Sequence, residues 1–203
     1  MNIKEHWTPN SPEGRDIAYH LHPYTNPDQL AYSGPHIIAS GKGIYVTDTE
    51  NKKFIEGMSG LWCASFGFSE RELIDAAIKQ MEKLPFYHSF AGKTSNPSID
   101  LAEKLISVAP DGLDKVFFCN SGSEANDTAI KMVWYYQESL GRPEKRKIIS
   151  RKRGYHGVTI GAASLTGLAY SHDGFGLPLD FAKHTSSPHY FADALENESE
   201  DEF

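Results

Sequence analysis

The residues best suited to chemistry form a small polar turn at positions 120–123, with the sequence Asn-Ser-Gly-Ser. Gly122 lets the backbone come close to a ligand. The free amides of a following helix would meet that ligand at the positive end of the helix dipole, and the hydroxyl groups of Ser121 and Ser123 would add hydrogen bonds. The turn therefore predicts a phosphate-binding site at a helix N-terminus. A plain serine N-cap followed by a glycine turn is the alternative.

Two common nucleotide-binding loops are excluded at this turn. No Gly-Lys-Ser or Gly-Lys-Thr sequence follows it, so it is not a Walker loop. The glycine spacing also differs from Gly-x-Gly-x-x-Gly, the fingerprint of dinucleotide-binding proteins. The anion that the turn would bind is therefore not identified by the turn alone.

The elements that must position the turn are a short apolar run at 116–119 and an amphipathic helix that extends to about residue 140. The apolar run has no period-2 alternation, as expected for a strand covered on both faces. The helical pattern is ended by Gly141 and Pro143. In open α/β sheets, ligands bind at the carboxyl ends of strands, which is where this strand–turn–helix unit places the turn.

The rest of the chain extends the same architecture. Helical spacing covers residues 70–84, with a capping box from Ser69 to Glu72, and a second helix follows the N-cap Asn96. The other expected segments are strands at 37–54 and 147–149, a helix at 159–170, and irregular chain at 1–35 and 171–191. This order of helices and strands predicts an α/β fold with a mainly parallel sheet.

Composition excludes several function classes. The chain has 203 residues, which suits one large domain or one and a half, and a net charge of −7, which argues against nucleic acid or anionic membrane as the main partner. No apolar signal core or membrane span is present, and the two cysteines read as buried thiols, so a cytosolic protein is expected. His20 and His22 have no cysteine or carboxylate partner at a metal-binding spacing, so no metal site is expected.

Three separated motifs resemble one enzyme family. Residues 120–131, Asn-Ser-Gly-Ser-Glu-Ala-Asn-Asp-Thr-Ala-Ile-Lys, closely resemble the N-S-G-S-E-A-N-x-x-A-x-K element of class III (omega) aminotransferases, which are pyridoxal-phosphate enzymes of fold type I. Residues 154–157, Gly-Tyr-His-Gly, resemble that family's Y-H-G element. Gly-Leu-Trp-Cys at 60–63 and Leu-Pro-Phe-Tyr at 84–87 resemble the subgroup that uses omega-amines or omega-amino acids with pyruvate.

The resemblance implies roles for the residues of the turn and of the second motif. Ser121, Gly122 and Ser123 would hold the phosphate of pyridoxal 5'-phosphate. Tyr155 would stack on the pyridine ring, since a flat aromatic side chain fixes the ring's tilt and excludes water, and His156 would lie beside it. A packed strand-end aromatic is the alternative for Tyr155.

The resemblance also implies a substrate pocket lined by Tyr24, Trp62 and Phe90, with ordinary packing as the alternative for each. It further implies a Schiff-base lysine and an acid near the pyridine nitrogen, and in the family both lie well beyond the second motif. The nearest lysines here are better interpreted as solvated charges: Lys115, Lys131 and Lys152. No catalytic residue is therefore assigned in this chain.

The expected organisation is an N-terminal arm and β-meander at 1–60, as part of a small domain, followed by the first part of a cofactor-binding large domain at 61–203. The chain resembles under half of a transaminase, and its acidic end at 198–203 reads as the start of a longer helix. The parent is expected to be a homodimer with a shared site that moves an amino group from an amine or omega-amino acid to pyruvate or a similar keto acid. An aminomutase, a decarboxylase and a non-catalytic remnant remain alternatives.

Overall fold

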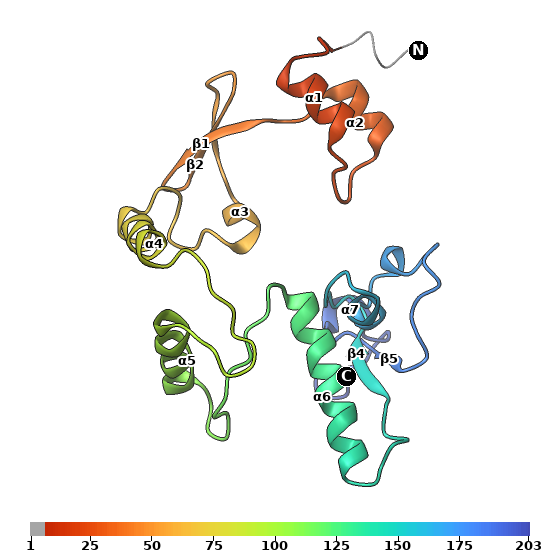
Figure 1. Ribbon diagram of the computed structural model, residues 1–203. Helices are drawn as coiled ribbons and strands as arrows, with labels where there is room; N and C mark the ends of the chain where they lie inside the picture. The colour runs from red at the N-terminus through yellow and green to blue at the C-terminus, as the bar shows by residue number, and fades with distance from the viewer. Residues whose placement is uncertain (1–6) are drawn as a thin grey trace. The chain divides into compact units, whose positions relative to one another are not determined.

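The computed structural model describes residues 7–203 (Figure 1). The chain divides into two compact units between Ser95 and Asn96. No helix in the described part of the chain is long and apolar enough to cross a membrane. The domain boundary expected near residue 60 stays a prediction.

Two short helices begin the first unit, where the sequence analysis predicted an irregular arm. α1 (Pro12–Tyr19) starts at the N-cap Ser11, whose Oγ accepts a hydrogen bond from the Gly14 amide at 3.0 Å. α2 (Pro27–Ser33) starts at the N-cap Asn26 in the same way. The prediction was wrong because a polar N-cap followed at once by proline is itself a helix-start signal.

A three-stranded antiparallel meander follows, as predicted. Its strands pair in chain order: β1 (Ile38–Lys42), β2 (Tyr45–Asp48) and β3 (Lys53–Ile55). The buried Asp48 side chain accepts hydrogen bonds from the Lys52 amide at 2.8 Å and the Glu50 amide at 3.0 Å. These bonds occupy backbone donors that a tight turn leaves unpaired, so Asp48 fixes the β2–β3 turn.

A single helical turn, α3 (Ser59–Trp62), contains the first three residues of the Gly-Leu-Trp-Cys motif. All four of its residues have positive φ, from 50° at Ser59 to 67° at Trp62. The left-handed region is favourable for Gly60 but not for Leu61 or Trp62. Trp62 therefore has a left-handed backbone conformation, which few residues other than glycine adopt.

α4 (Arg71–Lys83) confirms the helix predicted at 70–84, but the helix begins differently from the prediction. Its N-cap is Glu70, which makes no side-chain capping bond. Ser69 has a φ of 64°, and its Oγ donates instead to the carbonyl oxygen of Gly41 in β1. The predicted capping box is wrong because the Ser69 hydroxyl bonds to the meander rather than to the helix amides.

The second unit is organised around a long helix packed against a short one and a parallel strand pair. Its elements are α5 (Asn96–Val108), α6 (Gly122–Ser139), β4 (Ile148–Arg151), α7 (Ile160–Leu165), the 3-10 helix Ala169–Ser171, β5 (Ala182–Thr185) and α8 (Tyr190–Asp193). β4 and β5 pair in parallel, with Ile148 opposite Ala182. Ala182 forms the core with Ile130 of α6 and Leu165 of α7. The α/β class and the parallel pairing are thus confirmed.

Two strand predictions were wrong in opposite directions. Residues 116–119 form no strand, because no strand within residues 7–203 pairs with them and a ladder needs a partner to accept its hydrogen bonds. β5 was predicted to be irregular because Ala-Lys-His-Thr has no apolar pattern, yet pairing with β4 makes it a strand. The acidic end at 198–203 forms turns rather than a helix, and the Glu202 carboxylate accepts a hydrogen bond from the Ser199 amide.

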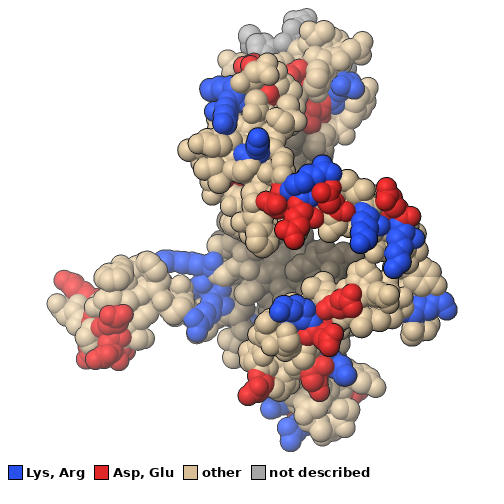
Figure 2. Space-filling model, turned by 90° about the vertical axis from the view of Figure 1, so that its left-hand side faces the viewer, with Lys and Arg blue, Asp and Glu red and all other residues tan. Residues whose placement is uncertain are grey.

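Apolar side chains stay exposed over much of both units. Neither α4 nor α5 buries any residue, and Leu73 of α4 and Ile99 of α5 are each half exposed. Figure 2 shows broad uncharged areas between separate groups of acidic and basic side chains. Cys63 is also exposed and Cys119 is partly exposed, so the prediction of buried thiols was wrong. Such surface is typical of regions that pack against further protein.

Candidate cofactor-binding site

The predicted turn leads directly into α6, as the sequence indicates. Ser121 is the N-cap, and its Oγ accepts a hydrogen bond from the Glu124 amide at 3.1 Å. The Glu124 carboxylate accepts in return from the Asn120 amide at 2.9 Å. Ser121 is therefore a helix N-cap, as the alternative interpretation predicted. This cap does not exclude anion binding, because a hydroxyl that accepts a hydrogen bond still has a proton to donate.

The donors that could hold an anion lie at the first residues of α6. Helix geometry leaves the amides of Gly122 and Ser123 without an intrahelical acceptor, and no other residue within 7–203 accepts from them. A Cβ built on Gly122 would meet no atom within 4 Å, so the backbone here is open to an approaching group. Two amides, two hydroxyl protons and a helix dipole suit a phosphate.

Side-chain hydrogen bonds from α6 hold the second motif against the turn. The Ser123 Oγ accepts from the Val158 amide at 3.0 Å. The Asn126 Nδ2 donates to the His156 carbonyl oxygen at 2.6 Å. Gly157 is buried with a φ of 136°, and any Cβ there would collide with Ser123. The structure thus brings the 121–123 turn and the 155–157 loop together, as the resemblance implies.

A buried threonine supports the same loop from the α7 side. Thr166 is fully buried, and its Oγ1 accepts a hydrogen bond from the His156 amide at 2.9 Å. His156 is consequently bonded on both backbone groups, to Asn126 and to Thr166. Tyr155, immediately before it, is 53% exposed. A half-exposed ring on a fixed backbone argues against core packing and fits a residue that stacks on a bound ring.

The structure also places three residues at this site for which the sequence predicted no role: Asn126, Asp127 and Thr166. Asn126 and Thr166 fix the loop. Asn126 belongs to the motif at 120–131, whereas no local signal marks Thr166. Asp127 has a buried Oδ1 that no group in the described structure bonds, and it lies so close to Gly161 that a side chain there would collide with it.

The predicted substrate residues belong to the first unit. Tyr24, Trp62 and Phe90 are all well exposed, with exposed fractions of 72%, 76% and 80%. Their roles in a substrate pocket stay predictions. Lys131 and Lys152 are likewise exposed, which agrees with their interpretation as solvated charges.

The 121–123 turn held beside the 155–157 loop, on an α/β scaffold, agrees with the fold type I architecture that the sequence motifs imply. The family model for class-III aminotransferases matches residues 30–202, and the chain belongs to that family. Pyridoxal phosphate is the family's cofactor. The open donors at α6 and the braced Tyr155 fit its phosphate and its ring.

Named relatives and solved structures agree with this assignment. The chain is 52% identical over 170 residues to the vanillin aminotransferase of Capsicum frutescens, covering 83% of this chain and 37% of that protein. It is 47% identical to the mitochondrial gamma-aminobutyrate transaminase 1 of rice, covering 96% of this chain and 38% of that protein.

The omega transaminase of Pseudomonas jessenii, solved in complex with PMP, matches with a TM-score of 0.92 at 54% identity, covering 95% of this chain and 42% of that one. A PMP-bound aminotransferase of Vibrio fluvialis matches with the same TM-score at 42% identity, covering 96% of this chain and 43% of that one. The chain therefore spans well under half the length of the relatives it matches.

Proposed function

We propose that the complete gene product carrying these residues transfers an amino group from an amine or omega-amino acid to pyruvate or a similar keto acid. The observation that carries this proposal is the α6 turn hydrogen-bonded to the 155–157 loop in a class III chain. The names of its relatives, an omega transaminase, a gamma-aminobutyrate transaminase and a vanillin aminotransferase, support amine donors in particular.

The residues of this chain would bind and orient the cofactor. Pyridoxal phosphate, when bound, supplies a ring that withdraws electrons from the substrate carbon. The amides of Gly122 and Ser123 and the two serine hydroxyls would hold its phosphate. Tyr155 would cover one face of the ring and exclude water from it, while Asn126 and Thr166 keep the Tyr155 backbone in place. No residue here is assigned as the nucleophile.

We further propose that the parent is a homodimer with a site shared between subunits, as expected for the family. The exposed apolar surface of α4 and α5 is consistent with further protein contacts. A cytosolic location also stays a proposal, since the names of the rice relatives place them in mitochondria. Light scattering of the complete gene product tests the first point and organelle fractionation tests the second.

A panel of amine donors tests the function. With pyruvate as acceptor, the complete gene product should form alanine from omega-amines or omega-amino acids. Activity on an amino-aldehyde without any transfer to pyruvate would instead show an aminomutase, and carbon dioxide release from an amino acid would show a decarboxylase. Either result would overturn the proposal.

A non-catalytic role is the second candidate, and the lack of a lysine at a matching motif favours it. Borohydride reduction in the presence of the cofactor, followed by mass analysis, separates the two. We expect no lysine adduct on the 203-residue chain and an adduct in any longer gene product. A stable adduct on any lysine of the 203-residue chain would contradict our conclusion that none of these lysines is the nucleophile.

A further inference from the structure

Three metal-ligating side chains converge at the C-terminal end of α1. Asp16 lies in α1, and His20 is the first residue after the helix. Because they are four residues apart, their side chains lie on the same face of the helix end. α1 ends at Tyr19, and His20 has extended backbone angles of −114° and 121°. In an extended segment, side chains two residues apart lie on the same side, which brings His22 toward His20.

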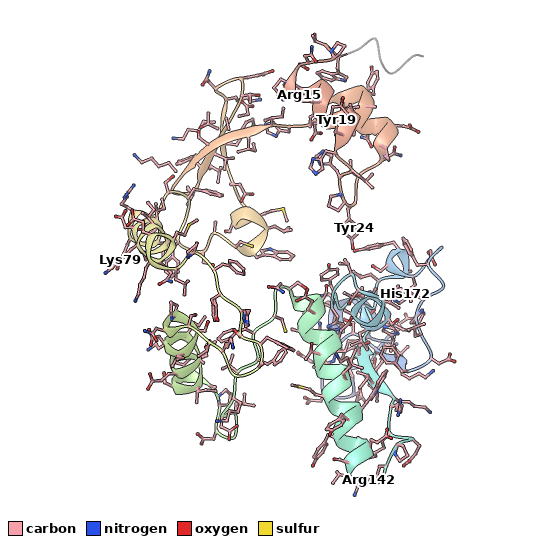
Figure 3. The ribbon with its side chains drawn as sticks, in the orientation of Figure 1. Arg15, Tyr19, Tyr24, Lys79, Arg142 and His172 are labelled. Carbon is pink, nitrogen blue, oxygen red and sulfur yellow. The ribbon has the colours of Figure 1, made fainter. Side chains whose placement is uncertain are left out.

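The distances confirm this convergence. The Asp16 Oδ1 lies 2.9 Å from the His20 Nδ1, and the Asp16 Oδ2 lies 2.7 Å from the His22 Nε2. One ligand atom from each residue lies within 4.8 Å of the others. The two imidazole rings are 4.1 Å apart at their centroids. Figure 3 labels Tyr19 and Tyr24, which flank the two histidines in the chain.

The expectation of no metal here rested on the lack of a carboxylate partner in the sequence, and that reason is wrong. The partner is Asp16, which lies before the histidines and meets them through the geometry of the helix end. A hydrogen-bonded helix end is the simpler interpretation. A hydrogen bond to the Asp16 carboxylate requires only one histidine, however. Asp48, for example, contacts the single histidine His36 at 3.2 Å.

A hollow borders the histidine side of this cluster. It has a volume of about 300 Å³ and is lined by residues that include His20, His22 and Thr25, but not by Asp16. Water can therefore approach the two imidazole rings from that side. Two imidazoles and one carboxylate are a donor set used for zinc and related divalent metals.

We propose that Asp16, His20 and His22 bind one divalent transition-metal ion, with Zn²⁺ as the best-suited ion and water in the open position. Zinc–ligand bonds of about 2.0–2.2 Å separate tetrahedral ligand atoms by roughly 3.4 Å, so the two contacts to Asp16 must open slightly. The proton on each coordinating ring nitrogen moves to the other nitrogen of the same ring. The His20 side chain is 60% exposed, so it can adjust without disturbing a core.

The charge of Asp16 suits this role. An aspartate carboxylate is anionic at neutral pH, so Asp16 brings the negative charge that favours a bound cation between the two imidazole rings. Tyr24 follows His22 by two residues, so a bound ion would also restrain the backbone that leads to Tyr24.

Calorimetric titration of the untagged full-length chain with Zn²⁺ tests the proposal, with Co²⁺ absorption as a second readout of ligand geometry. We expect one ion per chain. Asp16→Asn and His22→Gln should each weaken binding by about 100-fold or more, since even indirect partners of metal ligands contribute 10–100-fold. His36→Asn is the control: it removes the histidine that contacts Asp48, outside the proposed site, and should leave the affinity unchanged.

His20→Asn is the site variant that should still fold, because the His20 side chain is 60% exposed. A loss of Zn²⁺ affinity in this variant therefore reports on the site and not on misfolding. Failure of the wild-type chain to bind Zn²⁺ stoichiometrically would overturn the proposal. So would binding that all three site variants leave intact, because the ion would then be held by other histidines.

Discussion

The cofactor turn in the second unit and the exposed aromatic residues in the first unit are held in contrasting ways. The turn is fixed by two side-chain hydrogen bonds between positions 30 and 35 residues apart. The Asn126 side chain donates to the His156 carbonyl oxygen, and the Ser123 Oγ accepts from the Val158 amide. Trp62 and Phe90 are 76% and 80% exposed. The turn proposed to bind the phosphate is therefore held in place within the second unit, whereas the proposed substrate residues are not buried within the first unit.

The variant with the largest expected effect on this contrast is Gly157→Val. Valine would have to adopt a φ of 136° and would collide with Ser123 and Ala162. Strain and overpacking together should destabilise the second unit by about 2–4 kcal/mol and displace Tyr155. Denaturant unfolding followed by fluorescence measures the loss. An unchanged midpoint would show that the loop is not held tightly against α6.

Asn126→Ala should have the next largest effect. It removes the 2.6 Å hydrogen bond to the His156 carbonyl oxygen, a group that is partly shielded from water. The expected destabilisation is about 1–3 kcal/mol, with weaker binding of PMP to the complete gene product. Lys131→Ala, at an exposed position on the same helix, is the matched control and should change neither quantity. If Asn126→Ala and Lys131→Ala had equal stability and equal affinity for PMP, the Asn126 hydrogen bond would not be holding the loop.

Changes at Ser121 separate its two roles. Ser121→Asp keeps an N-cap side chain, so stability should hold within about 0.5 kcal/mol, but it places a negative charge where the phosphate would bind. Ser121→Ala combined with Ser123→Ala should weaken PMP binding by roughly 1–3 kcal/mol in total. Fluorescence titration of the complete gene product measures both affinities. Full affinity in Ser121→Asp would show that the turn is only a helix cap.

The smallest effect is expected in the first unit. Trp62→Ala and Phe90→Ala should each change the stability of the 203-residue chain by less than about 0.5 kcal/mol, because both side chains are exposed. In the complete gene product the same variants should change the preference among amine donors. A large loss of stability in the short chain would show that these aromatics pack locally, and the contrast between the two regions would fail.

Local spacing determined which features could be predicted. The helices at 70–84 and 122–140 and the turn at 120–123 follow from residues that are neighbours in the chain. Strand formation at 116–119 could not be predicted correctly, because it depends on a partner that the apolar run does not specify. β5 was missed for the converse reason, since its pairing with β4 outweighs its weak local pattern.

The same limit applies to side chains that meet across elements. Asn126 and Thr166 hold His156 from two different helix regions, and no spacing along the chain shows that they converge. Asp16 and the two histidines were missed at shorter range, because the predicted irregular arm gave no helix to bring them together. Once α1 is recognised from its Ser-Pro start, the four-residue spacing becomes informative.

The left-handed turn of α3 has a consequence for chirality. Its geometry is that of a helix built from mirror-image residues, so a D-amino acid fits where an L-amino acid is strained. Semisynthesis with D-leucine at position 61 should be tolerated there, although the same inversion within α4 or α6 would break the helix. At Leu61, the backbone has the left-handed conformation that an L-amino acid disfavours and a D-amino acid favours.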